Sequence, residues 1–185
     1  MTQAELDLFY WFNHRLASPQ LDVLMSLLSS TAFWLSVGIG VSLHRLYRQR
    51  GSRQGRGFLR VFLLFAATLI LTDMLSYYGL KDHLLRLRPC HELADVRLAA
   101  APCGGQYGLP SNHAANSMAV FTLWYLLFGY RRKFIALCGL LMVLAVCLSR
   151  VYLGVHYPSD IGAGFLVGAL MGSIAAGFAR TWLNA

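Results

Sequence analysis

Charged residues are scarce in this chain. Only 13% of the 185 residues are Asp, Glu, Lys or Arg, whereas a soluble domain of this size usually carries about 25%. Hydrophobic residues make up 57% of the sequence. This balance argues against an ordinary soluble domain and predicts a membrane protein, and the length allows one domain over residues 1–185.

Linkers, internal repeats and low-complexity segments are also missing. Residues 1–9 carry Glu5 and Asp7 and have no basic region ahead of an apolar run, so we expect no cleavable signal peptide. Acidic residues are few, and the formal net charge is +8. The arginines gather in short loops between apolar runs, a topological pattern that argues against nucleic-acid binding.

Long apolar runs dominate what is present. Five of them approach the ~20 residues that a helix needs to cross a bilayer. They cover residues 21–43, 58–80, 113–130, 134–150 and 158–182. The segment 4–16 is too short and too polar to cross the bilayer, and it is rich in aromatic residues. It therefore predicts an interfacial helix. We expect His14 to be a polar residue at the level of the lipid headgroups. The expected fold is an all-α integral membrane protein, a bundle of five transmembrane helices plus an N-terminal interfacial, or sixth, helix.

Basic loops predict the topology. They comprise 44–57, with Arg45, Arg48, Arg50, Arg53 and Arg56, and 131–133, and both fall on the same side as Arg180. The positive-inside rule assigns that side to the cytoplasm. Residues 81–112 and 150–158 then lie with the N-terminal helix at the outer face of the inner (plasma) membrane, although Arg97 and three further cations there weaken the asymmetry.

Small residues and cysteines give further expectations. Gly164, Gly168 and Gly172 repeat every four residues, which predicts close helix packing inside the bundle, with oligomerisation as the alternative. Cys138 and Cys147 are expected to be buried apolar residues. On the outer side, Cys90 and Cys103 form either a disulfide or two free thiols.

Two cations close the second apolar run. Lys81 and Arg88 are seven residues apart, so on one helix they share a face to within about 20°. Pro89 ends that helix directly after Arg88. The pair is placed to bind one anion above the bilayer, and headgroup snorkelling is the alternative.

A helix start follows at residues 110–113. Ser111 is the expected N-cap, and the free backbone N–H groups of the first turn suit phosphate oxygens. His113 in that turn can act as a general acid, provided that a phosphate dianion keeps it protonated, or it can be a capping residue without chemistry.

The third polar stretch contains Arg150, His156 and Asp160. Pro158 suits a first helical turn, and Asp160 stands four residues after His156. Asp160 can therefore accept a hydrogen bond from one ring nitrogen and leave the other as a nucleophile, or the pair can be purely structural. A competing zinc site would use His83, His91, His113 and His156, but no HExxH or CxxC spacing supports it, and three cations oppose it.

Together these stretches resemble the type 2 phosphatidic acid phosphatase (PAP2) superfamily, in its integral-membrane branch. The family pattern is Lys, six residues, Arg-Pro; then Pro-Ser-Gly-His; then Ser-Arg, five residues, His, three residues, Asp. Residues 81–89 and 149–160 fit the first and third motifs, whereas Asn112 stands where the second has Gly.

The resemblance implies a role for each site residue. His156 would attack phosphorus and form a phosphohistidine, Asp160 would orient it, and His113 would protonate the leaving oxygen. The remaining members would hold the phosphate without a metal or other cofactor; they are Lys81, Arg88, Ser111, Arg150 and the amide of Asn112. Arg86 lies off the face shared by Lys81 and Arg88 and is kept as a supporting residue.

An intramembrane carboxylate stands outside these motifs. We expect Asp73 either to hold Arg150 or another site cation, or to make a structural hydrogen bond.

The expected partners are membrane lipids and a lipid phosphate substrate, with no obligate protein partner. The compactness of the chain and the outward orientation of the site favour undecaprenyl diphosphate as the substrate. Lipid A 1-phosphate, phosphatidylglycerol phosphate and phosphatidic acid are the alternatives. Lipid phosphotransfer and non-enzymatic lipid binding or transport are also open.

Overall fold

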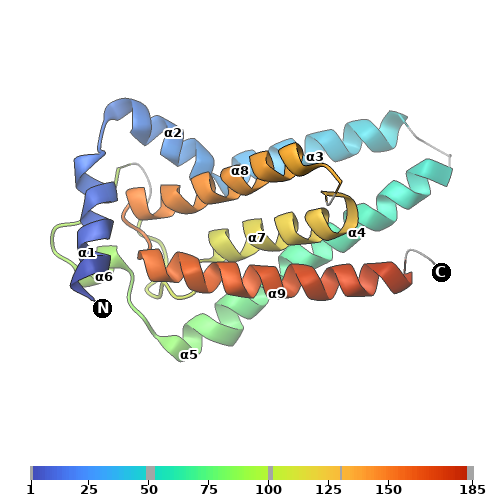
Figure 1. Cartoon of the computed structure of the whole chain (residues 1–185). Coiled ribbons are helices and arrows are strands. Elements are labelled where there is room, and N and C mark those ends of the chain that lie inside the picture. Colours follow the sequence, from blue (N-terminus) through green and yellow to red (C-terminus); the bar gives the residue numbers. More distant parts are fainter. Residues whose placement is uncertain (1, 49–52, 100–101, 130, 183–185) are drawn as a thin grey trace.

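The computed structural model describes residues 2–48, 53–99, 102–129 and 131–182, and this part of the chain is largely helical (Figure 1). Its helices are α1 (Gln3–Tyr10), α2 (Pro19–Ser29), α3 (Thr31–Arg48), α4 (Arg53–Met74), α5 (Asp82–Leu84), α6 (Pro89–Glu92), α7 (Asn112–Trp124), α8 (Lys133–Tyr152) and α9 (Pro158–Trp182). Three π-helical segments continue them, η1 (Trp11–Arg15), η2 (Leu75–Lys81) and η3 (Tyr125–Gly129). Arg50 and Tyr130 lie outside the described residues, as do the side chains of Arg45, Arg53 and Arg56.

Within the described ranges, three helices are long and apolar enough to cross a membrane: Gly57–Leu84, Lys133–Tyr152 and Pro158–Thr181. A fourth span is formed only if Pro19–Ser29 and Thr31–His44 count together, and these bend by 54° at Ser30. The span predicted over residues 21–43 is therefore a pair of helices broken at Ser30 and not one straight helix. Ser30 has extended backbone angles, and its hydroxyl accepts a hydrogen bond from the Phe33 N–H at 3.2 Å, so it ends one helix and caps the next.

The fifth long segment, α7 with η3, lies inside the bundle against α9, α4 and α8. The glycines of α9 allow this contact. A Cβ at Gly168 would lie 2.3 Å from the carbonyl oxygen of Ala115, and one at Gly172 would lie 2.5 Å from that of Ala119. The predicted packing of the glycine repeat inside the bundle is confirmed, and it fixes the start of α7 against the start of α9.

The two cysteines of α8 differ from the expectation that both are buried. Cys147 is buried, but Cys138 is exposed. The prediction for Cys138 is wrong because a lipid-facing apolar position looks the same in sequence as a protein-facing one.

The N-terminal helix covers one end of the bundle. Phe9 is fully buried, with its ring centroid 5.6 Å from that of Tyr157. Asn13 donates to the Tyr152 carbonyl at 2.8 Å and accepts from the Arg97 N–H at 2.9 Å. Figure 1 shows α6 and the starts of α7 and α9 at this same end, with the turn before α8 at the other. The predicted gathering of the three polar stretches at one end is confirmed.

Candidate active site

A buried His–Asp pair lies where the α8–α9 link enters α9. His156 is 1% exposed and Asp160 is fully buried. His156 Nδ1 lies 3.3 Å from Asp160 Oδ2, which also accepts from the Tyr157 N–H at 2.9 Å. The link turns sharply because Gly154 has a φ of +78° and packs against the loop that carries Arg97. Local spacing and this turn therefore bring imidazole and carboxylate together.

The other ring nitrogen of His156 faces a cation. Arg88 Nη1 lies 3.4 Å from Nε2, and because a guanidinium only donates, Nε2 must carry the lone pair. Nδ1–H then donates to Asp160. Burial lowers the pKa of His156 well below its usual value, and the neighbouring cations lower it further. The ring is thus neutral, and the lone pair on Nε2 faces the Arg88 guanidinium at the cavity.

Three cations surround one cavity. Lys81 is only 3% exposed, and burial lowers the pKa of the Arg88 guanidinium. Lys81, Arg88 and Arg150 line a cavity of about 260 Å³, and His113 and His156 also lie in its wall. Its full lining is Tyr77, Lys81, Asp82, Arg88, Gly105, Gln106, Tyr107, Asn112, His113, Arg150 and His156. Clustered positive charges repel one another in a poorly hydrated space, so this cavity favours an anion.

Lys81 and Arg88 reach the cavity by a different route from the one expected. The helix ends at Leu84, because Leu85 adopts the left-handed conformation with a φ of +50°. Arg88 is extended, as the residue before a proline prefers, and its N–H donates to the Gln106 carbonyl at 3.1 Å. The prediction of one helix through Arg88 is wrong, although both side chains line the same cavity.

The start of α7 supplies His113 and Asn112 to the cavity. Ser111 occupies the N-cap position, but its side chain makes no cap bond, and its buried Oγ has no partner among the described residues. Ser111 is not among the cavity-lining residues; its N–H instead donates to the Asp160 carbonyl at 3.0 Å. His113 Nε2 lies 3.0 Å from the Ser29 carbonyl oxygen, at the bend between α2 and α3.

Asp73 contacts the residue that departs from the family motif. Its Oδ1 accepts from Asn112 Nδ2 at 2.8 Å and from Asn116 Nδ2 at 2.9 Å. Arg150 instead donates to the hydroxyl of Ser29. Asp73 therefore makes the hydrogen bonds that one expectation named, and no ion pair joins it to Arg150 among the described residues. It still lies near enough to the site cation Lys81 to act on it electrostatically.

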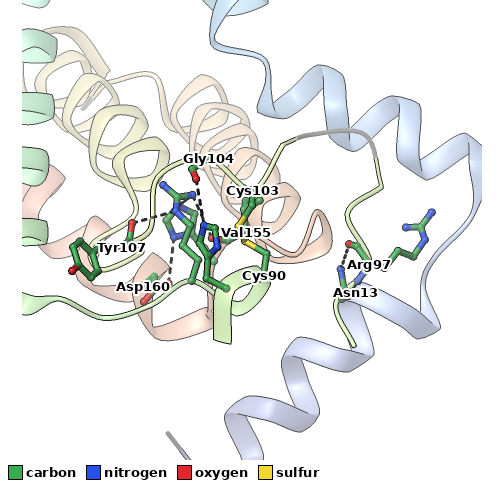
Figure 2. The surroundings of a disulfide bond; sticks show 11 residues. Asn13, Cys90, Arg97, Cys103, Gly104, Tyr107, Val155 and Asp160 are labelled. Atoms are coloured by element: carbon green, nitrogen blue, oxygen red, sulfur yellow. Dashed lines mark hydrogen bonds and ion pairs between the residues drawn. A yellow bond between two sulfur atoms is a disulfide. The ribbon is translucent and has the colours of Figure 1, made fainter. Parts of the chain in front are cut away.

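The four histidines of the competing zinc set do not converge in the described structure. His113 and His156 line the cavity, whereas His83 is exposed on α5. His91 Nε2 lies 3.3 Å from the Gly104 carbonyl, beside a disulfide that joins Cys90 and Cys103 (Figure 2). His14 Nε2 lies 3.3 Å from the Asp95 carbonyl at the bundle end.

Several cavity residues were not identified from sequence. Tyr77 had a signal, since it precedes Lys81 by four residues and so shares its helix face. Gln106 and Tyr107 had none, because they arrive through a loop. That loop is held by the disulfide and by the Tyr107 carbonyl, which accepts from Arg88 Nε at 3.2 Å (Figure 2).

A helical bundle with membrane-length apolar helices, and a buried His–Asp pair beside a cavity that three cations line, is the construction of a membrane-embedded phosphoryl-transfer enzyme. The family model of the PAP2 superfamily matches residues 58–183. The chain therefore belongs to the PAP2 superfamily and is a membrane phosphatase of its lipid phosphatase group, and the resemblance seen in sequence is confirmed.

Relatives of known activity cover most of the chain. A lipid A 4'-phosphatase of Bacteroides thetaiotaomicron is 28% identical over 93% of this chain and 75% of its own length. The lipid A 4'-phosphatase of Porphyromonas gingivalis is 30% identical over 92% of this chain and 70% of its own length. The crystal structure of a transmembrane PAP2-type phosphatidylglycerolphosphate phosphatase from Bacillus subtilis superposes with a TM-score of 0.67 at 22% identity, covering 97% of this chain and 88% of that one. The all-α membrane fold is thereby confirmed.

Proposed function

We propose that this chain hydrolyses a lipid phosphate ester without a metal, through a phosphohistidine on His156. The observation that carries the proposal is the placement of His156 Nε2. It carries a lone pair, faces the cavity beside Arg88, and has Asp160 behind its other nitrogen. The cation and the nucleophile thus line one cavity, and the orienting carboxylate lies behind the nucleophile.

The reaction uses two displacements. The Nε2 lone pair of His156 forms a bond to phosphorus while the bond from phosphorus to the lipid oxygen breaks, and His113 gives that oxygen a proton. A water molecule then attacks the phosphohistidine, the P–N bond breaks, and His113 takes up the water proton. Lys81, Arg88 and Arg150 neutralise the transferring oxygens. The Asn112 amide is assigned the same task.

The relatives favour a phosphate ester of lipid A as the substrate. Two lipid A 4'-phosphatases align over most of this chain. Undecaprenyl diphosphate, favoured by compactness and orientation alone, is the second candidate. A site at the periplasmic face is supported by the Cys90–Cys103 disulfide, since such bonds persist in oxidising compartments.

A phosphate-release assay on the purified protein in nanodiscs tests the proposal. The substrates are lipid A phosphate, phosphatidylglycerol phosphate, phosphatidic acid and undecaprenyl diphosphate. We expect turnover that persists in chelator, is inhibited by vanadate, and is fastest with lipid A phosphate. Transfer of the phosphate to an added acceptor lipid in place of water would identify a phosphotransferase.

Matched histidine variants test the nucleophile. His156→Ala should abolish hydrolysis and leave substrate binding intact, because the phosphate-binding cations remain. His83→Ala is the control, because this histidine is exposed on α5, outside the cavity, and its loss should leave turnover unchanged. Hydrolysis that survives His156→Ala refutes the assignment.

A further inference from the structure

Arg86 lies outside the cavity but binds the carboxylate behind the nucleophile. Its Nη1 donates to Asp160 Oδ1 at 2.9 Å, while Oδ2 of the same carboxylate faces His156. Asp160 is fully buried, so three groups set the orientation of its carboxylate. They are Arg86 on Oδ1, and His156 and the Tyr157 N–H on Oδ2. The guanidinium also lies 4.7 Å from the centre of the Tyr157 ring.

Glu5 of the N-terminal helix holds Arg86 from the opposite side. Arg86 Nη2 lies 3.3 Å from both carboxylate oxygens of Glu5. Glu5 Oε1 also accepts from the backbone N–H of Ser159 at 3.0 Å and from its hydroxyl. Burial raises the pKa of Glu5, but the bonds from Ser159 and Arg86 outweigh it and lower the pKa overall. Glu5 is therefore an anion bound both to Arg86 and to the first turn of α9.

Charge balance explains why Arg86 is paired with Glu5. The cavity already contains Lys81, Arg88 and Arg150, so another cation close to His156 would be unfavourable if it stood alone. Glu5 offsets the charge of Arg86 and lets Arg86 stay against Asp160. With Oδ1 held by Arg86, Oδ2 has one orientation, and the Nδ1–H of His156 has one acceptor.

We propose that Glu5 and Arg86 are positioning residues for the nucleophile, which fix Asp160 so that Nε2 of His156 points at the phosphate. The proposal rests on the assignment of His156 as the nucleophile. The N-terminal helix is then part of the catalytic support as well as a cover for the end of the bundle. Hydrogen-bond partners that orient metal-ligating histidines typically contribute about 10–100-fold to metal affinity or activity, and we expect an effect of the same size for this nucleophile.

Steady-state kinetics of the full chain in nanodiscs tests this. Glu5→Gln and Arg86→Gln should each lower kcat by about 10–100-fold, with KM changed less than about threefold, because phosphate binding is untouched. Arg86→Lys should recover part of the loss. Asp7→Asn removes another carboxylate from α1, which accepts from Gln3 Nε2 at 2.9 Å, and should leave kcat unchanged.

A double-variant cycle separates positioning from general stability. In an Asp160→Asn background, Arg86→Gln should lower kcat no further, since the carboxylate it orients is gone. A full multiplicative loss in that background would overturn the proposal. Arg97→Gln, which breaks the ion pair with Asp22 at the same end of the bundle, controls for loosening of the loops and should change kcat by less than about twofold.

The outcomes also distinguish the two proposals. If His156→Ala is inactive while Arg86→Gln and Glu5→Gln turn over normally, the positioning role fails and the nucleophile assignment stands. If His156→Ala remains active, the proposed function itself fails. A loss of kcat in Arg86→Gln that Arg97→Gln reproduces would mean that Arg86 acts only on folding.

Discussion

Gly108 packs directly on the His–Asp pair, and Gly108→Ala should lower turnover without unfolding the protein. A Cβ at this position would lie 2.9 Å from Asp160 Oδ2 and 3.5 Å from His156 Nδ1. Carbon–oxygen contacts are normally 3.3 Å or more, so the carboxylate must retreat by about 0.4 Å. The Gly108 N–H donates to the Arg86 carbonyl at 2.8 Å, which limits how far the loop itself can move.

The size of the effect follows from that displacement. A misplacement of about 1 Å at a catalytic group costs on the order of 10²-fold, so about 0.4 Å corresponds to a loss of roughly fivefold to tenfold in kcat. KM should stay within about twofold, because the contact to Arg88, at 3.3 Å, falls on Cγ of its aliphatic stem and is looser than the 2.9 Å contact to Asp160. Overpacking costs about 1–3 kcal/mol, so the variant should still fold.

Phosphate release and thermal unfolding, measured on the same nanodisc preparation, check this prediction. Gly162→Ala is the matched control, since a Cβ there meets nothing within 4 Å and the residue lies two positions after Asp160. Wild-type kcat in Gly108→Ala would refute the reasoning. So would a rise in KM at constant kcat, which would place the clash on the phosphate site instead of the His–Asp pair.

Three further predictions follow from the packing, the disulfide and the nucleophile. Gly168→Ala should lower the thermal midpoint by at least the equivalent of about 1–3 kcal/mol because a backbone carbonyl occupies the space, whereas Gly177→Ala, with nothing within 4 Å, should not; equal midpoints would contradict the packing. Cys90→Ser opens a loop of sequence separation 13 and should cost ~3 kcal/mol in chemical unfolding, whereas Cys138→Ser, at a free thiol, should cost little. Because the pKa of His156 lies well below 6.5, its neutral form persists as pH falls, so kcat/KM should hold down through pH 6.5; an acid limb in kcat/KM centred at 6.5 or above would contradict this.

Sequence spacing predicted the parts of the site that lie close together along the chain. His156 and Asp160 are four residues apart, and the first turn of α9 brings them into contact. The same reasoning failed for Lys81 and Arg88, because it assumed a helix that Leu85 ends early. Both side chains still reach one cavity through the pairing of Arg88 with Gln106, which no local pattern indicates.

Departures from the family motif are also interpretable only in three dimensions. In sequence, Asn112 stands where the family motif has glycine, and the resemblance assigns its amide to the phosphate. In the structure its side-chain amide donates to Asp73, from the second long helix. The bend at Ser30 likewise gives His113 its carbonyl partner, Ser29, which lies 84 residues away in sequence.

The sequence by itself determined the class of the protein, its apolar helices, and the residues that we propose carry the chemistry. Those properties depend on composition, on periodicity and on spacings of a few residues, which constrain neighbours along one helix. Only the tertiary structure decided which distant groups support them. Glu5 and Ser159 are 154 positions apart and meet because α1 packs across the start of α9. Such contacts depend on how the surfaces of the helices pack together, and no local sequence pattern specifies that packing.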